Sequence, residues 1–134
     1  TTSAIPTSQN PQSAWQTIRT PAELTQSLAA AKAGGQPLLL DWYADWCISC
    51  KVIEREVLTA SAVTTQLSSF RLIRFDMTES NAEQRALLDH YQLFGPPALM
   101  MFAGNGDEHR DLRVIGEINA EDFAARLRQA NAKN

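Results

Sequence analysis

The residues best suited to chemistry in this sequence are Cys47 and Cys50, the only two cysteines among its 134 residues. A disulfide between cysteines this close encloses too short a loop to stabilise a fold by much. Two neighbouring thiols can instead be oxidised to a disulfide and reduced again, so the pair stores an electron pair and passes it on. We therefore interpret Cys47 and Cys50 as a redox-active pair.

The position of the pair supports this interpretation. The cysteines follow an apolar run, residues 37–44, that predicts a buried strand, and they open a predicted helix over residues 47–58. Free N–H groups and the helix dipole at a helix N-terminus stabilise a thiolate. We expect Cys47, at the mouth of the helix, to be exposed enough to attack a partner's disulfide. Cys50, one turn further in, would then resolve the mixed disulfide.

Two acidic residues belong to the same candidate site. Asp41 interrupts the apolar strand six residues before Cys47, and a buried acid is costly unless it is paired or has a function. Glu54 shares a helix face with both cysteines. Negative charge near a thiol raises its pKa and opposes the helix terminus. Our hypothesis is that Asp41 shuttles the proton of Cys50 and Glu54 modulates it. The alternatives are a hydrogen-bonded core acid and a solvated helix residue.

Two further segments are candidates for partner docking. Pro96 and Pro97 precede a short apolar strand, residues 98–102, and X-Pro bonds adopt the cis form at low cost. A cis peptide before Pro97 would turn a short backbone stretch toward the cysteines, where it could align an incoming peptide and exclude metal. A rigid loop is the simpler alternative. Trp46, next to Cys47, is expected to form an apolar shelf, although packing alone would also explain it.

The elements that must position these residues alternate along the chain. We predict five strands and five helices, the first helix starting at the capping box of Thr20 and Glu23. The strands are expected at residues 15–19, 37–44, 70–76, 98–102 and 112–117, and the helices at 21–33, 47–58, 62–67, 79–91 and 120–130. This order predicts an α/β domain over residues 14–134 with parallel strands and a late antiparallel pair. Residues 1–13, rich in Thr, Ser, Gln, Asn and Pro, are predicted to be a flexible linker or arm.

Composition excludes several classes of function. The net charge is −3 with scattered basic residues, so nothing favours nucleic-acid binding. No apolar run reaches the roughly 18–20 residues of a membrane span, and we expect no membrane insertion of this domain. Beyond the cysteines only His90 and His109 could complete a zinc site, and both lie far from the pair. We expect a monomer that needs no metal or organic cofactor beyond its own disulfide.

These motifs together resemble the thioredoxin superfamily. The resemblance covers residues 15–130 and rests on Trp46-Cys47-x-x-Cys50-Lys51, on Asp41 and on Pro97 before the final strand pair. It implies a thioredoxin-like fold, in which helices flank both faces of a central mixed β-sheet. It also implies a cis peptide before Pro97 and Cys47 as the nucleophile. Two departures are Ile48-Ser49, where ordinary thioredoxins have Gly-Pro, and Ala98, where Thr is frequent.

Within the superfamily the chain is most similar to the C-terminal periplasmic domains of bacterial transmembrane thiol–disulfide interchange proteins. Residues 40–47, Glu54 and residues 93–102 carry this resemblance. It implies a periplasmic domain of an inner-membrane protein that receives electrons from the transmembrane domain. The domain would pass them to the N-terminal periplasmic domain of the same protein, for disulfide isomerisation and cytochrome c maturation. Acids matching Asp41 and Glu54 tune the cysteines in that family. Arg74 falls near a family lysine that pairs with the buried acid, but we do not include it in the predicted site.

Three alternatives remain open at this point. The nearest is a stand-alone thioredoxin-like protein-disulfide reductase, which the full-length gene product would distinguish. A non-catalytic interaction module predicts that Cys47 reacts no faster than an ordinary exposed thiol. A zinc-binding module predicts stoichiometric metal after purification.

Overall fold

A five-stranded mixed sheet forms the centre of the molecule. The computed structural model describes residues 14–134, so the predicted linker at residues 1–13 lies outside the described part. The strand order is β1-β3-β2-β4-β5. The strands are β1 (Gln16–Ile18), β2 (Leu38–Tyr43), β3 (Arg71–Asp76), β4 (Ala98–Phe102) and β5 (Val114–Ile115). β3 runs parallel to both β1 and β2, whereas β4 is antiparallel to β2 and to β5. The predicted mixed sheet is confirmed.

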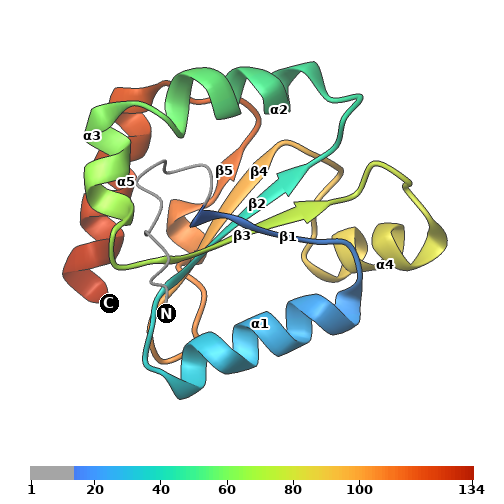
Figure 1. Ribbon diagram of the computed structural model, residues 1–134, viewed down its shortest axis with the longest axis horizontal. Helices are drawn as coiled ribbons and strands as arrows, with labels where there is room; N and C mark the ends of the chain where they lie inside the picture. Colours follow the sequence, from blue (N-terminus) through green and yellow to red (C-terminus); the bar gives the residue numbers. More distant parts are fainter. Residues whose placement is uncertain (1–13) are drawn as a thin grey trace, which may run out of the picture.

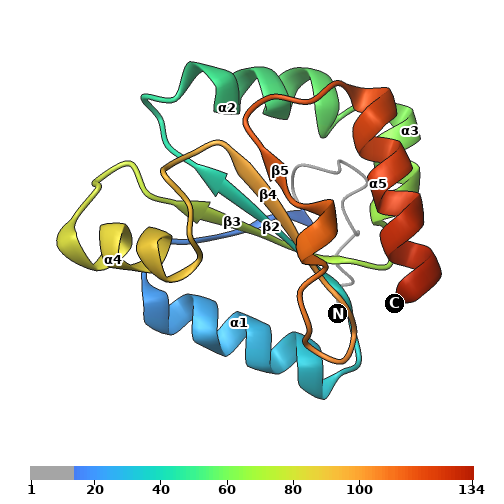
Figure 2. The ribbon, with the colours of Figure 1, turned by 180° about the vertical axis from the view of Figure 1, so that it is seen from behind.

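Helices cover both faces of this sheet (Figures 1 and 2). α1 (Pro21–Ala33) and α4 (Ala82–His90) lie on one face. α2 (Ile48–Val52), α3 (Ser61–Thr64) and α5 (Ala120–Lys133) lie on the other. This is the thioredoxin-like arrangement expected from the sequence. No helix within residues 14–134 combines the length and the apolar character needed to cross a membrane.

The start of α1 follows directly from its sequence. The Thr20 hydroxyl accepts a hydrogen bond from the Glu23 N–H (3.2 Å), and the Glu23 carboxylate accepts one from the Thr20 N–H (3.1 Å). Pro21 has no N–H to leave unpaired in the first turn. The reciprocal cap therefore starts the helix where the sequence predicts.

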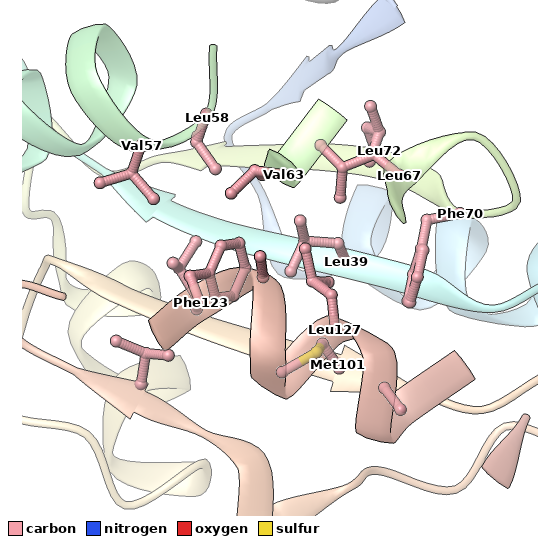
Figure 3. Packing of buried hydrophobic residues seen from close by; sticks show 14 of the residues in the cluster. Leu39, Val57, Leu58, Val63, Leu67, Phe70, Leu72, Met101, Phe123 and Leu127 are labelled. Atoms are coloured by element: carbon pink, nitrogen blue, oxygen red, sulfur yellow. The ribbon is translucent and has the colours of Figure 1, made fainter. Parts of the chain in front are cut away.

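β2 is the strand that holds the site, and it is buried on both faces. Leu39 packs in one cluster with residues of α3 and α5, whereas Leu40 and Trp42 pack in a second cluster with residues of α1 and α4. Figure 3 shows Leu39 in the first cluster together with Met101, Phe123 and Leu127. Continuous burial of this kind is typical of a central strand between two helical layers. It gives β2 a fixed position from which to present its carboxyl end.

α4 is shorter than predicted. It begins at Ala82 because the Asn81 side chain caps the N–H of Gln84, whose own side chain accepts from the Asn81 N–H. This capping box excludes residues 79–81 from the helix. In the first turn of α4 Gln84 is buried, whereas Ala82 is exposed.

β5 is also much shorter than predicted. Arg110–Leu112 form a 3-10 turn, and Gly116 has a positive φ of 88° that ends the strand. Arg113 lies between this turn and the strand, and its guanidinium donates hydrogen bonds to the carboxylate of Glu108. The antiparallel pairing with β4 is confirmed, but the strand keeps only two residues.

The helix that follows the cysteines changes its winding. α2 ends at Val52 and continues as a π-helical turn, Ile53–Val57, before α3 starts at Ser61. A wide turn of this kind is rare and often marks a functional site. It lies one turn after Cys50 and contains Glu54, so it determines where that carboxylate points.

Candidate redox site

Cys47 and Cys50 form a disulfide between the end of β2 and the first turn of α2. Cys47 is the N-cap residue, and its Sγ accepts a hydrogen bond from the Cys50 N–H at 3.1 Å. The Sγ of Cys50 lies 3.7 Å from the Trp42 carbonyl oxygen. Cys47 retains 6% of its surface and Cys50 only 2%. Cys47 is therefore the more accessible of the two cysteines. It is nevertheless far less exposed than expected from the sequence, because its sulfur packs against the first turn of α2.

Asp41 lies in β2, one residue before the Trp42 carbonyl that approaches Cys50. Its side chain is buried, and no group within residues 14–134 hydrogen-bonds to its Oδ2. Burial raises the pKa of Asp41 from 3.8 to about 8, against the opposing effect of the Arg74 guanidinium. The negative charge of Glu54 contributes to this rise. Asp41 is thus not the fully hydrogen-bonded core acid of the alternative interpretation, and near neutral pH its carboxyl group can both hold and release a proton.

Arg74 of β3 connects the two acids. It is the register partner of Asp41 on the neighbouring strand, and its Nε lies 3.7 Å from Asp41 Oδ2. Its Nη2 lies 2.6 Å from Glu54 Oε2. The guanidinium carbon also lies 5.3 Å from the centre of the Tyr43 ring and 5.7 Å from that of Trp15. Arg74 is therefore held between aromatic rings and two carboxylates.

Glu54 is not the solvated helix residue of the alternative interpretation, because it is part of this ion pair. Burial raises its pKa, while Arg74 and Lys51 act in the opposite direction. The structure thus brings together Asp41, Glu54 and Arg74. Arg74 was left outside the predicted site, although the alternation of β3 and its expected pairing with β2 are signals that would have included it.

A second polar network fixes the loop before Cys47. The Thr78 hydroxyl accepts a hydrogen bond from the Asp45 N–H (2.8 Å) and donates to the carboxylate of Asp76 (2.5 Å). The Thr78 carbonyl accepts from the Trp46 indole N–H at 3.0 Å. Thr78 therefore holds both residues that precede Cys47, a role that the sequence analysis did not predict.

Pro96 and Pro97 directly precede β4, whose first residue, Ala98, is the register partner of Trp42 near the end of β2. The peptide bond between the two prolines is cis, as the resemblance implies. The Pro97 carbonyl accepts a hydrogen bond from the Gly116 N–H (3.1 Å), and the next residue, Glu117, accepts one from the Ser49 hydroxyl (2.6 Å). These contacts tie the proline segment, the end of β5 and the start of α2 to one another.

Large apolar side chains are exposed on these same segments. Within residues 14–134 they are Trp46, Ile48, Phe94 and Ile115. Phe94 and Ile48 are the most exposed, at 103% and 80% of their full surface. Exposed apolar groups gathered in one region mark a surface that another molecule can cover. Trp42, by contrast, is fully buried and belongs to the core.

The comparisons with known proteins agree with this geometry. A family model described as thioredoxin-like matches residues 17–104, and the chain belongs to this family. In three dimensions the chain is similar to the oxidised C-terminal domain of Neisseria meningitidis DsbD, with a TM-score of 0.72 and 30% identity. That match covers 86% of this chain and 99% of the DsbD domain.

Curated relatives carry the same name. The chain is 63% identical over 116 residues to "Thiol:disulfide interchange protein DsbD 1" of Pseudomonas aeruginosa, which covers 87% of this chain and 20% of that protein. It is 40% identical over 111 residues to "Thiol:disulfide interchange protein DsbD" of Escherichia coli K12, covering 83% of this chain and 19% of that protein. The chain therefore spans about a fifth of the length of these relatives.

The residues that could hold a metal ion do not gather in the described part of the chain. Within residues 14–134 no group of three or more His, Cys, Asp or Glu side chains is arranged to bind one. The redox group that the structure does contain is the Cys47–Cys50 disulfide.

Proposed function

We propose that this chain is a thiol–disulfide exchange domain that relays electron pairs through Cys47 and Cys50. The observation that carries the proposal is the disulfide at the start of α2, with the Cys50 sulfur next to the Trp42 carbonyl and the raised-pKa carboxyl of Asp41 one residue away. A less buried sulfur that can attack, a more buried sulfur that can resolve and a nearby proton acceptor together suit dithiol exchange.

The reaction runs in two steps. The Cys47 thiolate attacks one sulfur of a partner's disulfide, forms a mixed disulfide and releases one partner thiol. The Cys50 thiolate then attacks the Cys47 sulfur, which releases the second partner thiol and leaves the Cys47–Cys50 disulfide. The partner gains an electron pair and two protons, and the domain loses the same. The roles follow from accessibility, since Cys47 is the less buried sulfur.

Asp41 is proposed to take the proton of Cys50 before the second step. With a pKa of about 8, its carboxyl group is close enough to neutral pH to accept that proton and return it later. Glu54 acts on Asp41 through charge, because a second carboxylate disfavours the ionised form of the first. Arg74 limits this effect by binding both.

Trp46, Pro96 and Pro97 are proposed to form the docking edge for the partner. Ile48, Phe94 and Ile115 extend this edge with exposed apolar surface. A partner that covers these side chains would shield the mixed disulfide from water, and the cis peptide segment would align the partner's chain. This supports a protein partner rather than a small molecule.

The partners are proposed to lie in the same parent protein. The relatives are thiol:disulfide interchange proteins, and the match with this chain covers about a fifth of their length. The chain would be their periplasmic C-terminal domain in a bacterial inner-membrane protein, a monomeric unit that takes electrons from the transmembrane domain. It would give them to the N-terminal periplasmic domain, which supplies disulfide isomerisation and cytochrome c maturation. It would use no cofactor other than its disulfide.

Trapping the intermediate tests the relay. The reduced domain is mixed with the oxidised N-terminal domain of the parent protein, and Cys50→Ser is expected to accumulate a mixed disulfide through Cys47. Cys47→Ser is the matched control and should trap nothing. A mixed disulfide that forms through Cys50 instead, or no electron transfer by the unmodified domain, would contradict the proposal.

The carboxylate hypothesis has its own test, the pH dependence of Cys47 alkylation in the reduced domain. If Asp41 and Glu54 hold the thiol protonated, Asp41→Asn and Glu54→Gln lower the apparent thiol pKa. If both variants leave the profile unchanged, the carboxylates do not tune Cys47.

A further inference from the structure

One hydrogen bond joins the segment between the two cysteines to a distant part of the chain. The Ser49 hydroxyl donates to Glu117 Oε2 at 2.6 Å, across 68 residues of sequence. The distance is short, as expected when the acceptor is a carboxylate, and such bonds are about twice as strong as neutral ones. Ser49 lies directly before Cys50, so this contact acts on the turn that carries both sulfurs.

Glu117 is held in place from its own side as well. It follows Gly116, whose positive φ of 88° turns the chain at the end of β5. The Gly116 N–H donates to the Pro97 carbonyl at 3.1 Å, and Ile115 pairs with Ala98 in the sheet. The carboxylate therefore projects from a backbone that is fixed to the cis proline segment.

We propose that Glu117 is a positioning residue of the redox site. Acting through Ser49, it ties the segment between the cysteines to the proline segment and keeps a negative charge beside the first turn of α2. The proposal rests on the dithiol exchange proposed above and adds a residue that acts on it from outside the cluster of Asp41, Glu54 and Arg74.

The charge has a direct consequence for the reduced enzyme. The first turn of α2 is where the thiolate of Cys47 must form, since Cys47 is the N-cap residue and its sulfur accepts the Cys50 N–H. A carboxylate fixed near the same turn repels that thiolate and favours the thiol. Lys51 and Asp45, which are both bound to the Tyr43 hydroxyl, also lie near this turn. On the other side, Arg113, Asp122 and Arg126 line the same pocket as Glu117. Glu117 is the acid that contacts the segment between the cysteines directly.

The experiment measures Cys47 alkylation in the reduced domain as a function of pH for four single variants and one double variant. Glu117→Gln removes the charge but keeps an oxygen that can accept from Ser49. It should therefore fold normally and should alkylate faster below the thiol pKa, by roughly two- to fivefold for a charge at this range. Glu117→Ala removes both the charge and the bond. Glu121→Gln, a change of the same charge at an exposed position in the first turn of α5, is the matched control and should leave the profile unchanged.

Ser49→Ala tests whether the effect passes through Ser49. This variant should raise the alkylation rate in the wild-type background, because the carboxylate is no longer held against the turn. In the Glu117→Ala background it should add nothing. An unchanged profile for Glu117→Gln, or equal effects of Ser49→Ala in both backgrounds, would overturn the proposal. Mixed-disulfide trapping by Cys50→Ser is independent of these readouts, so failure of this inference can be told apart from failure of the relay.

Discussion

Asp41 and Arg74 are register partners on adjacent parallel strands, yet their charged groups lie 3.7 Å apart and the Asp41 Oδ2 receives no hydrogen bond from residues 14–134. Arg74 makes its shorter contact, 2.6 Å, with Glu54. The arginine is thus shared unequally between the buried carboxylate of Asp41 and the half-buried carboxylate of Glu54. Burial raises the pKa of Asp41, and the shared guanidinium offsets only part of that rise.

The first prediction concerns Asp41→Asn and the pH dependence of stability. The folded pKa of Asp41 is about 8 against an ordinary value of 3.8, so the folded state keeps a proton that the unfolded state releases between those values. The Asp41 contribution therefore lowers stability progressively as pH rises from about 4 to 8. Replacing Asp41 with asparagine, which does not ionise, removes this loss of stability at high pH. We expect the variant of the oxidised domain to be more stable than wild type at pH 8, on the order of 5 kcal/mol, and to gain little at pH 4.

Urea denaturation at several pH values measures this difference. Asp89→Asn, at an exposed position in α4, is the control and should show no comparable dependence on pH. A gain of equal size at pH 4 and pH 8 would mean that Asp41 is not protonated in the folded domain.

The second prediction concerns Arg74→Gln. Removing the guanidinium leaves the buried Asp41 and the half-buried Glu54 without a compensating positive charge, which costs on the order of 3 kcal/mol at pH 8. The same change should raise the pKa of Asp41 further, because Arg74 is the group that lowers it. The measurement is a double-mutant cycle: in an Asp41→Asn background the loss caused by Arg74→Gln should shrink. Equal losses in both backgrounds would show that the two residues are not coupled.

The third prediction concerns Thr78→Val, which keeps the shape of the side chain and removes its hydroxyl. The Asp45 N–H then loses its acceptor and Asp76 loses a donor. We expect a loss of about 1–3 kcal/mol in thermal or urea unfolding. Thr78→Ser keeps the hydroxyl and should recover most of it. If serine behaves like valine, the methyl group rather than the hydrogen bonds accounts for the effect.

The fourth prediction concerns Phe94, which is fully exposed in the segment before the prolines. Because Phe94→Ser removes no buried contact, the stability of the domain should hardly change. The rate of exchange with a protein partner should fall by roughly tenfold if the ring is an anchor of the docking edge. The rate of reduction by dithiothreitol should stay the same, since a small reagent needs no docking edge. Phe94→Leu keeps an apolar side chain and serves as the control; a parallel loss of both rates in Phe94→Ser would instead indicate a damaged site.

Local sequence signals predicted the elements that hold the cysteines. The Thr20 capping box starts α1, the apolar run of β2 is buried on both faces, and Ala98–Phe102 form β4 as expected. The start of α4 could also have been predicted from the sequence, because Asn81 and Gln84 have the spacing of a capping box. These features depend on neighbours in the chain, and for that reason they are accessible without a structure.

The features that were not predicted from the sequence depend on contacts between residues far apart in the chain. Arg74 joins the acids only because β3 pairs with β2 in one particular register. Thr78 reaches Asp45 and Trp46 because the ends of the same two strands meet. The low accessibility of Cys47 and the truncation of β5 likewise follow from packing rather than from propensity. The cysteine pair and its two neighbouring acids could therefore be predicted from the sequence, whereas Arg74 and Thr78, which contact the acids and the loop before Cys47, were not.

The short outer strands of the sheet have a consequence for turnover. β1 and β5 are the two edges, and they contain only three and two residues. A long open edge would let the backbones of two proteins join into one continuous sheet and remain associated. A carrier that must bind one protein, react and then leave for another benefits from edges too brief for such pairing. Its complexes then depend on side-chain contacts and on one transient mixed disulfide, and they dissociate once that disulfide has been resolved.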